Sequence, residues 1–347
     1  MDSIDEKLQS WDQIKAQFDR ESGILLGNGF SCAVWDKFEY PSLYEKACSS
    51  ADIEHYLSSK DIQLFEAMRT KNFERILSML FDARKVNEIF GQEHLLFVQR
   101  YEHIKKALGE AVKCVHVPWD KVKSSNILSR IRQELKNYKF VYSTNYDLLI
   151  YWAIMSDEDN KNDFKDFFWN SGVSTNSMKF DITNTHIRNS TTRVLYLHGA
   201  LHLHRDPLLG ITYKLVNSGF ENLLEILDVP LFITEGSSED KLRAINSSDY
   251  LFFAYNKLLE HEGSLVIFGH SLGETDEHLV KAIRESDPKK IAISIRSNNS
   301  LDTIRKKKAD LYEKLCNNKP PSKRPDLLFF DAQTHPLGSP NIKIQDN

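Results

Sequence analysis

Seven short apolar runs recur along this chain, and most of them are nearly continuous rather than alternating. They cover residues 23–26, 140–142, 194–197, 231–233, 265–268, 291–295 and 327–330. Continuous apolar runs are typical of strands buried on both faces, as in a parallel sheet covered by helices. Helical patterns lie between several of the runs. We therefore predict an α/β fold with a Rossmann-like, doubly wound parallel sheet.

The gap between the first two runs is unusually long. More than 100 residues separate Leu26 from Phe140. Inside the gap, apolar residues recur at three- and four-residue spacing over 73–80 and again over 101–112, with charges between them. This pattern predicts a large helical insertion after the first strand, with 124–137 as its last helix. We expect 1–40 and 138–347 to form the Rossmann domain and 41–137 to form the helical subdomain.

Composition and charge restrict the class of protein. The chain has 347 residues, 41% of them hydrophobic, which suffices for a sizeable core. The net charge of −4 gives no global attraction to nucleic acid or to an acidic membrane. The amino-terminal residues lack a signal-peptide pattern, no apolar run approaches the roughly 20 residues of a membrane helix, and the four cysteines show no C-x-x-C spacing. We expect a cytoplasmic protein without a disulfide framework, membrane contact or direct nucleic-acid contact.

Three polar motifs directly follow three of the predicted strands. They are Gly27–Ser31, Ser143–Asp147 and His198-Gly199. Because parallel strands end at the same edge of a sheet, a glycine turn, an amide and an imidazole should lie together there. This combination suits a site that cleaves a dinucleotide.

The first two motifs each have a structural alternative. Gly27 and Gly29 let backbone amides approach a phosphate, although the third glycine of a dinucleotide fingerprint is missing, so they are also compatible with a tight turn. Asn145 can orient a water or a ribose hydroxyl. Its alternative is a turn in which Asp147 caps the helix that begins at Leu148.

The histidines after the third strand favour acid–base chemistry over metal binding. We predict that His198 is an exposed general base at the end of its strand, because an unperturbed imidazole has a pKa of about 6.5. His198 lacks a companion carboxylate or cysteine at a familiar ligand spacing, as do its neighbours His202 and His204. We expect a structural or surface role for them and no metal ligands in the chain.

A second kind of hydrolase is also compatible with the sequence. Residues 269–273 read Gly-His-Ser-Leu-Gly after an apolar strand, which satisfies the serine-hydrolase pattern G-x-S-x-G. Ser271, Asp331 and His335 would then form an esterase- or lipase-like triad. A nucleophilic serine needs a helix that begins beside it, whereas the next helix is predicted to begin near Thr275. Ser271 is therefore expected in a loop, and the esterase remains an alternative.

Taken together, the motifs resemble the sirtuin-like NAD-binding family, particularly its bacterial branch without the deacylase zinc module. Gly27–Ser31 matches the family's G-A-G-x-S, and 143–147 matches T-Q-N-x-D. His198-Gly199 matches H-G, and 269–272 matches G-x-S-L. Residues 40–44 look like the proline-containing cofactor loop without its arginine. The segments Phe232–Lys241 and Ser248–Tyr250 further resemble an uncharacterised bacterial subgroup.

The resemblance implies NAD as substrate, no zinc, and hydrolysis of NAD rather than deacylation. It assigns catalysis to Asn145 and His198 and cofactor binding to Gly27, Asn28, Gly29, Phe30, Ser31, Asp147, Gly269, Ser271 and Leu272. Members of this branch linked to bacteriophage defence deplete NAD, often as oligomers or with a partner protein such as a defence ATPase. By similarity we expect a homo-oligomer or such a partner. A catalytically silent NAD-binding interaction module is the other alternative.

Overall fold

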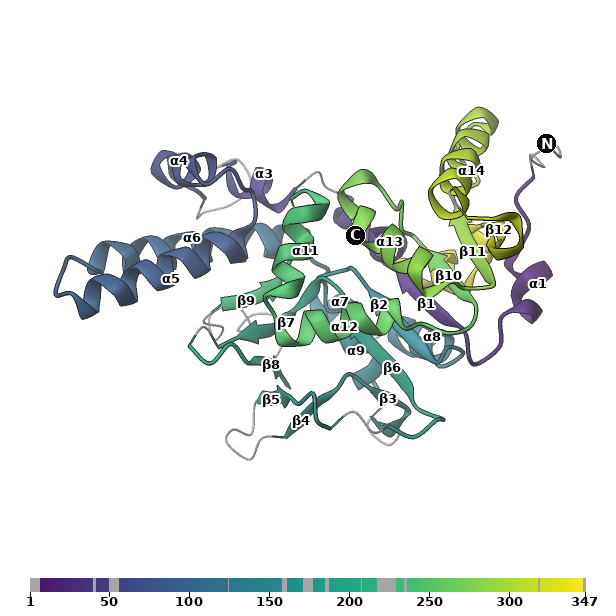
Figure 1. Cartoon of the computed structure of the whole chain (residues 1–347), viewed down its shortest axis with the longest axis horizontal. Coiled ribbons are helices and arrows are strands. Elements are labelled where there is room, and N and C mark those ends of the chain that lie inside the picture. Colours follow the sequence, from purple (N-terminus) through teal and green to yellow (C-terminus); the bar gives the residue numbers. More distant parts are fainter. Residues whose placement is uncertain are drawn as a thin grey trace.

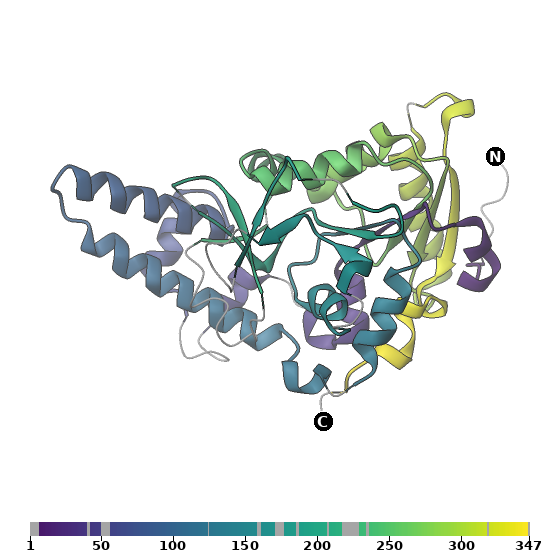
Figure 2. The same ribbon diagram turned by 90° about the horizontal axis from the view of Figure 1, so that it is seen from below.

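Seven parallel strands form the central sheet, in the order β12-β11-β10-β1-β2-β6-β3. The computed structural model describes residues 7–39, 42–49, 56–123, 125–157, 161–170, 177–184, 187–206, 208–216, 229–233, 236–317 and 319–345. Helices flank the sheet, as Figures 1 and 2 show. The predicted α/β, Rossmann-like fold is confirmed.

Six of the seven predicted runs are strands of this sheet. They are β1 (Gly23–Leu26), β2 (Phe140–Ser143), β6 (Thr192–Tyr196), β10 (Leu265–Phe268), β11 (Lys290–Ile295) and β12 (Asp326–Asp331). The seventh strand is instead β3 (Phe164–Lys165), which pairs with β6 at the edge. Two residues are too few to produce a periodic pattern, so β3 could not be predicted from the sequence.

A second, antiparallel sheet contains the remaining predicted run. Its order is β4-β5-β8-β7-β9, and the strands are β4 (Phe168–Asn170), β5 (Ser177–Phe180), β7 (Gly199–Arg205), β8 (Thr212–Leu215) and β9 (Val229–Phe232). The assignment of 231–233 to the parallel sheet was wrong. The polar composition of 156–192 and the Gly and Pro residues of 201–230 also predict irregular structure, but β4, β5, β8 and most of β7 lie within these ranges. Strands such as β5 are only partly buried and carry Ser and Lys, which resemble loop composition.

Several helices lie between β1 and β2. They are α2 (Asn28–Val34), α3 (Leu43–Ala47), α4 (Ser59–Ala67), α5 (Phe73–Ile89), α6 (Leu95–Val115), α7 (Trp119–Lys123) and α8 (Ile127–Leu135). α5 and α6 form an antiparallel hairpin that projects from the body of the molecule (Figures 1 and 2). α8 instead packs on α9 (Leu149–Met155) beside the sheet. No helix in the described part of the chain is long and apolar enough to cross a membrane.

The remaining described helices complete the layers around the two sheets. They are α1 (Trp11–Ile14), α11 (Ser238–Asn246), α12 (Asp249–Leu259), α13 (Glu277–Ser286) and α14 (Leu301–Cys316). α11 and α12 pack together, and α13 contacts both of them as well as α14. The amino-terminal ends of α11 and α13 therefore come close to each other.

The turns after β1 and β10 cross in direct main-chain contact. Gly27 N–H donates to Phe268 O at 3.0 Å, and Gly29 N–H donates to Gly269 O at 2.8 Å. A Cβ added at Gly29 would lie 2.7 Å from the Gly269 Cα. Gly269 itself has a φ of +67°, and a Cβ there would lie 2.4 Å from the Phe30 nitrogen. Glycine is thus required on both sides of the crossing.

Replacing Gly269 tests this crossing. Gly269→Ala should lower the free energy of unfolding more than Gly91→Ala, which serves as its control. Gly91 has nearly the same φ, +64°, but no atom within 4 Å of an added Cβ. Positive φ alone costs an alanine about 1–2 kcal/mol, and the overlap should add roughly 1–3 kcal/mol. Urea unfolding of both variants measures the difference, and equal losses would contradict the contact.

Candidate active site

A cleft of about 970 Å³ lies where β1, β2, β6 and β10 end. This volume is in the range of small-molecule sites. Six of the eleven predicted site residues line it, namely Asn28, Gly29, Asn145, His198, Gly269 and Ser271. The other five, Gly27, Phe30, Ser31, Asp147 and Leu272, lie behind this lining. Of the predicted cofactor loop, Tyr40 and Pro41 fall outside the described residues, whereas Ser42 and Leu43 line the cleft.

The side-chain amide of Asn145 is held in one orientation. Its Nδ2 donates to Gly27 O at 3.0 Å and to Ser31 Oγ at 2.8 Å, which uses both of its hydrogens. Its Oδ1 has no donor among the described residues. Because Asn145 lines the cleft, this oxygen is available to accept a hydrogen bond from a bound molecule.

Ser31 and Asp147 fix the position of Asn145 through a chain of hydrogen bonds. Ser31 Oγ donates to Asp147 Oδ2 at 2.5 Å, and the other carboxylate oxygen accepts from Leu149 N–H at 2.9 Å. Burial raises the pKa of Asp147, while these two hydrogen bonds oppose the rise. The predicted capping by Asp147 is corrected: α9 begins at Leu149 with Leu148 at its N-cap, and Asp147 closes the turn one residue earlier by accepting from Leu149 N–H. Neither side chain lines the cleft, so their assignment to direct cofactor contact is corrected to support of Asn145.

The glycine amides do not have the role that the sequence suggested. The N–H groups of Gly27 and Gly29 already donate to carbonyls of the β10 turn. They are therefore not available to a phosphate, and the assignment of these two amides as phosphate donors is corrected. The tight-turn alternative describes them better, because their missing side chains permit the crossing.

His198 lies at the junction of the two sheets. β6 ends at Tyr196 and β7 begins at Gly199, so only Leu197 and His198 separate the parallel sheet from the antiparallel one. Gly199 makes this passage with a φ of +76°. His198 is only 4% exposed, so the predicted exposed histidine is instead buried, with one edge at the cleft.

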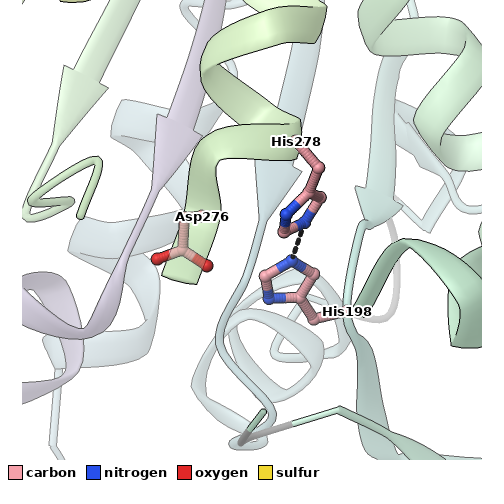
Figure 3. A group of neighbouring side chains, drawn as sticks. All are labelled: His198, Asp276 and His278. Atoms are coloured by element: carbon pink, nitrogen blue, oxygen red, sulfur yellow. Dashed lines mark hydrogen bonds between the residues drawn. The ribbon is translucent and has the colours of Figure 1, made fainter. Parts of the chain in front are cut away.

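Residues from two other helices surround the His198 ring. Its Nε2 lies 2.9 Å from the Nε2 of His278, and the Nδ1 edge faces away from that residue (Figure 3). Asp276 lies beside the pair and is bound by the ammonium of Lys241 at 2.7 Å. The ring of His270 is 3.9 Å from the same carboxylate.

These neighbours keep the imidazoles neutral. Burial, with Lys241 and His278, lowers the pKa of His198 well below its usual value. Burial also lowers the pKa of His278 to about 4, although Asp276 opposes the shift. For Asp276 itself, burial would raise the pKa, but His270 and Lys241 outweigh it and lower the pKa. The site thus has neutral histidines beside an ammonium–carboxylate pair.

Three of these side chains form the one group of possible metal ligands found among the described residues. Ligand atoms of His198, Asp276 and His278 lie within 4.8 Å of one another. However, Lys241 already neutralises the carboxylate, and the two imidazoles bind each other. A cation there would have to displace both contacts, so the arrangement favours a hydrogen-bonded cluster over a metal centre.

Sequence reasoning missed part of this cluster. His278 and Ser238 gave no motif of their own. Lys241 ends the segment that resembles the bacterial subgroup, and Asp276 directly follows the predicted helix start near Thr275. The available signals were two short spacings, Ser238 with Lys241 and Asp276 with His278. Neither indicates a site by itself, because only the fold brings the starts of α11 and α13 together.

The esterase triad is not assembled. Ser271 lies in an exposed loop, and α13 begins at Glu277, as the sequence predicted for an inert serine. His335 is fully buried beside Glu134 and Tyr138, and its Nδ1 accepts from Leu337 N–H. Those residues border a separate cavity of about 660 Å³. His335 therefore cannot serve Ser271 in this structure.

The fold and the cleft define a Rossmann-like α/β protein with a polar site at the carboxyl ends of its strands. The chain belongs to the DUF4917 family, described as a domain of unknown function, whose model matches residues 24–336. A search of curated proteins gave no match.

The buried histidines predict an acid-labile fold. Burial lowers the pKa of His116 and His278 to about 4 and of His202 and His335 to about 3. Since these folded values lie below about 6.5, the unfolded chain binds more protons, and stability falls as pH drops from there. Each histidine contributes roughly 1.4 kcal/mol per pH unit, while Glu74, with a pKa raised to about 7, opposes them.

Urea unfolding from about pH 7.5 to about pH 5 measures this dependence. We expect the free energy of unfolding to decrease steadily over this range. A flat profile, or greater stability at the acid end, would contradict the neutral buried histidines.

Metal removal is expected to have no effect. Because the carboxylate of Asp276 is already paired with the ammonium of Lys241, the purified protein should hold far less than one equivalent of transition metal per chain. Elemental analysis measures this content, and thermal unfolding before and after dialysis against a chelator measures any stabilisation. A stoichiometric metal that is lost with a drop in melting temperature would show that the cluster is a metal site.

Proposed function

We propose that this protein hydrolyses NAD at the nicotinamide–ribose bond to give ADP-ribose and nicotinamide. One observation carries the proposal: Asn145 Oδ1 and His198 Nδ1 belong to residues lining one cleft, and neither atom has a hydrogen-bond partner among the described residues. An amide oxygen is an acceptor, and so is His198 Nδ1 when the hydrogen of the neutral imidazole is on Nε2. Together they suit the orientation and deprotonation of a water or a ribose hydroxyl.

The reaction needs a nucleophile at the ribose carbon and no covalent intermediate. As the glycosidic bond breaks, neutral nicotinamide leaves and the ribose acquires oxocarbenium character. Asn145 Oδ1 accepts a hydrogen bond from the attacking water, and His198 Nδ1 takes the proton as the new carbon–oxygen bond forms. General-base catalysis supplies about 10²–10⁴-fold, and positioning must supply the remainder.

The anionic pyrophosphate would be met by side chains rather than by the glycine amides. Arg296, Lys307 and Lys314 line the cleft. Within the described ranges, the Arg296 side chain forms one exposed ion pair, with Glu39 at 3.5 Å, which is a weak contact that a phosphate can replace. Ser271, exposed in the loop after β10, would contact ribose or phosphate.

The cellular role follows from the resemblance to the sirtuin-like family. We propose NAD depletion in bacterial defence against phage, without zinc, in a homo-oligomer or with a partner such as a defence ATPase. The polar cleft and the Asn–His pair support the NAD chemistry on which this role depends.

The test is NAD turnover by the full chain. ADP-ribose and nicotinamide should form with the wild type, and both Asn145→Ala and His198→Ala should lower kcat by about 10²-fold or more. His94→Ala, on the projecting hairpin, is the matched histidine control and should keep wild-type activity. Full activity in both site variants would contradict the assigned roles.

Binding measurements separate the alternatives. If neither the wild type nor any variant turns over NAD, NAD binding is measured by calorimetry. A silent NAD-binding module still binds NAD, whereas a protein without an NAD site does not. Ester hydrolysis that is lost only in Ser271→Ala would instead establish the esterase.

A further inference from the structure

The amino-terminal ends of α11 and α13 are joined by two polar contacts beside His198. Ser238, the first residue of α11, accepts from the backbone N–H of His278 at 2.8 Å and lies 3.1 Å from its ring Nδ1. One turn later, Lys241 binds Asp276 at 2.7 Å. Ser238 and Lys241 belong to the segment 232–241, for which hydrolysis of NAD alone provides no task.

Every polar group of His278, in the backbone and in the ring, has a hydrogen-bond partner. Its carbonyl accepts from the hydroxyl of Tyr255 at 2.9 Å, and its ring Nε2 faces His198 at 2.9 Å. His278 is buried and does not line the cleft. In the described part of the chain, it is also the one hydrogen-bond partner of the His198 ring. His278 therefore sets the orientation of His198 without touching a ligand.

The hydrogen count along this chain decides what His198 can do. If Nδ1 of His278 donates to Ser238, its Nε2 must accept from the Nε2–H of neutral His198. The Nδ1 of His198 then carries no hydrogen and can act as a base in the cleft. In the opposite order Ser238 donates, and His198 would present an N–H to the cleft. Ser238 is suited to the first order because its oxygen has two lone pairs for the two N–H groups of His278.

We propose that His278 is the positioning and relay residue of His198, and that it receives the proton that His198 passes on. The proposal rests on the proposed function. When His198 Nδ1 takes a proton from water or a ribose hydroxyl, its Nε2–H moves to Nε2 of His278. His198 ends neutral, and His278 ends as an imidazolium whose Nδ1–H remains bound to Ser238.

One neighbour of His278 stabilises the positive charge that it would carry only transiently. The carboxylate of Asp276 lies within 4.8 Å and favours the imidazolium. Lys241 and His270 also face the pair and oppose it, which keeps both histidines neutral at rest. Asp276 paired with Lys241 therefore limits how much charge the relay stabilises, so that the proton can return after turnover.

Two substitutions separate positioning from relay. Glutamine at position 278 can still accept from His198 Nε2–H but cannot take its proton, whereas alanine can do neither. We expect His278→Gln to lower kcat about 10-fold and His278→Ala about 10²-fold, each with KM nearly unchanged. His94→Gln is the matched control and should behave as the wild type. Wild-type kcat in both variants at position 278 would overturn the proposal.

Nitrogen NMR of the imidazoles tests the relay independently of turnover. It should show His198 as the Nε2–H tautomer in the wild type and in His278→Gln, and as a mixture in His278→Ala. Finding the Nδ1–H tautomer in the wild type, or no change in His278→Ala, would overturn the hydrogen order. If the wild type consumes no NAD, the proposed function fails, while these spectra still decide whether His278 sets the tautomer of His198.

Discussion

The contact between the turns after β1 and β10 is the constraint on which the cleft depends. Gly29 N–H binds Gly269 O at 2.8 Å, and no side chain fits between the two backbones. This contact places Gly27 O where Asn145 Nδ2 can donate to it. The orientation of the Asn145 amide, and thus its free acceptor in the cleft, follows from a packing requirement of main chain on main chain.

The cluster around His198 depends on a different kind of constraint. Five titratable side chains are largely removed from water together, and the cost of burying charge is offset by pairing Lys241 with Asp276 while the histidines stay neutral. The same pair links α11 to α13. The Lys241–Asp276 ion pair therefore both compensates the buried charges and joins the helices that surround His198. Removing it would disturb the position of His198.

The sequence predicts the central sheet and its motif-bearing edge because continuous apolar runs are a local signal. β1, β2 and β10 carry that signal, and the polar groups just after them lie where parallel strands end. It could not predict β3, which has two residues, or the transfer of β9 to a second sheet, since an apolar run does not specify its partner.

The candidate site shows the same division between local and distant information. Asn145 and His198 follow their strands directly and could be selected from the sequence. The use of the Gly27 and Gly29 amides, and the partnership of His198 with His278, depend on residues 80 or more positions away. Hydrogen bonds of that kind are set by tertiary packing, and no single-sequence pattern records them.

The passage of the chain from one sheet to the other at His198 has a kinetic consequence. Leu197 N–H is bound to Ser143 O on one side, and His198 O is bound to Ile233 N–H on the other, both at 2.8 Å. The backbone at His198 thus has no freedom to swing toward a ligand. The side chain at position 198 is therefore held in place before any molecule enters the cleft, so movement that accompanied binding would have to come from other parts of the lining.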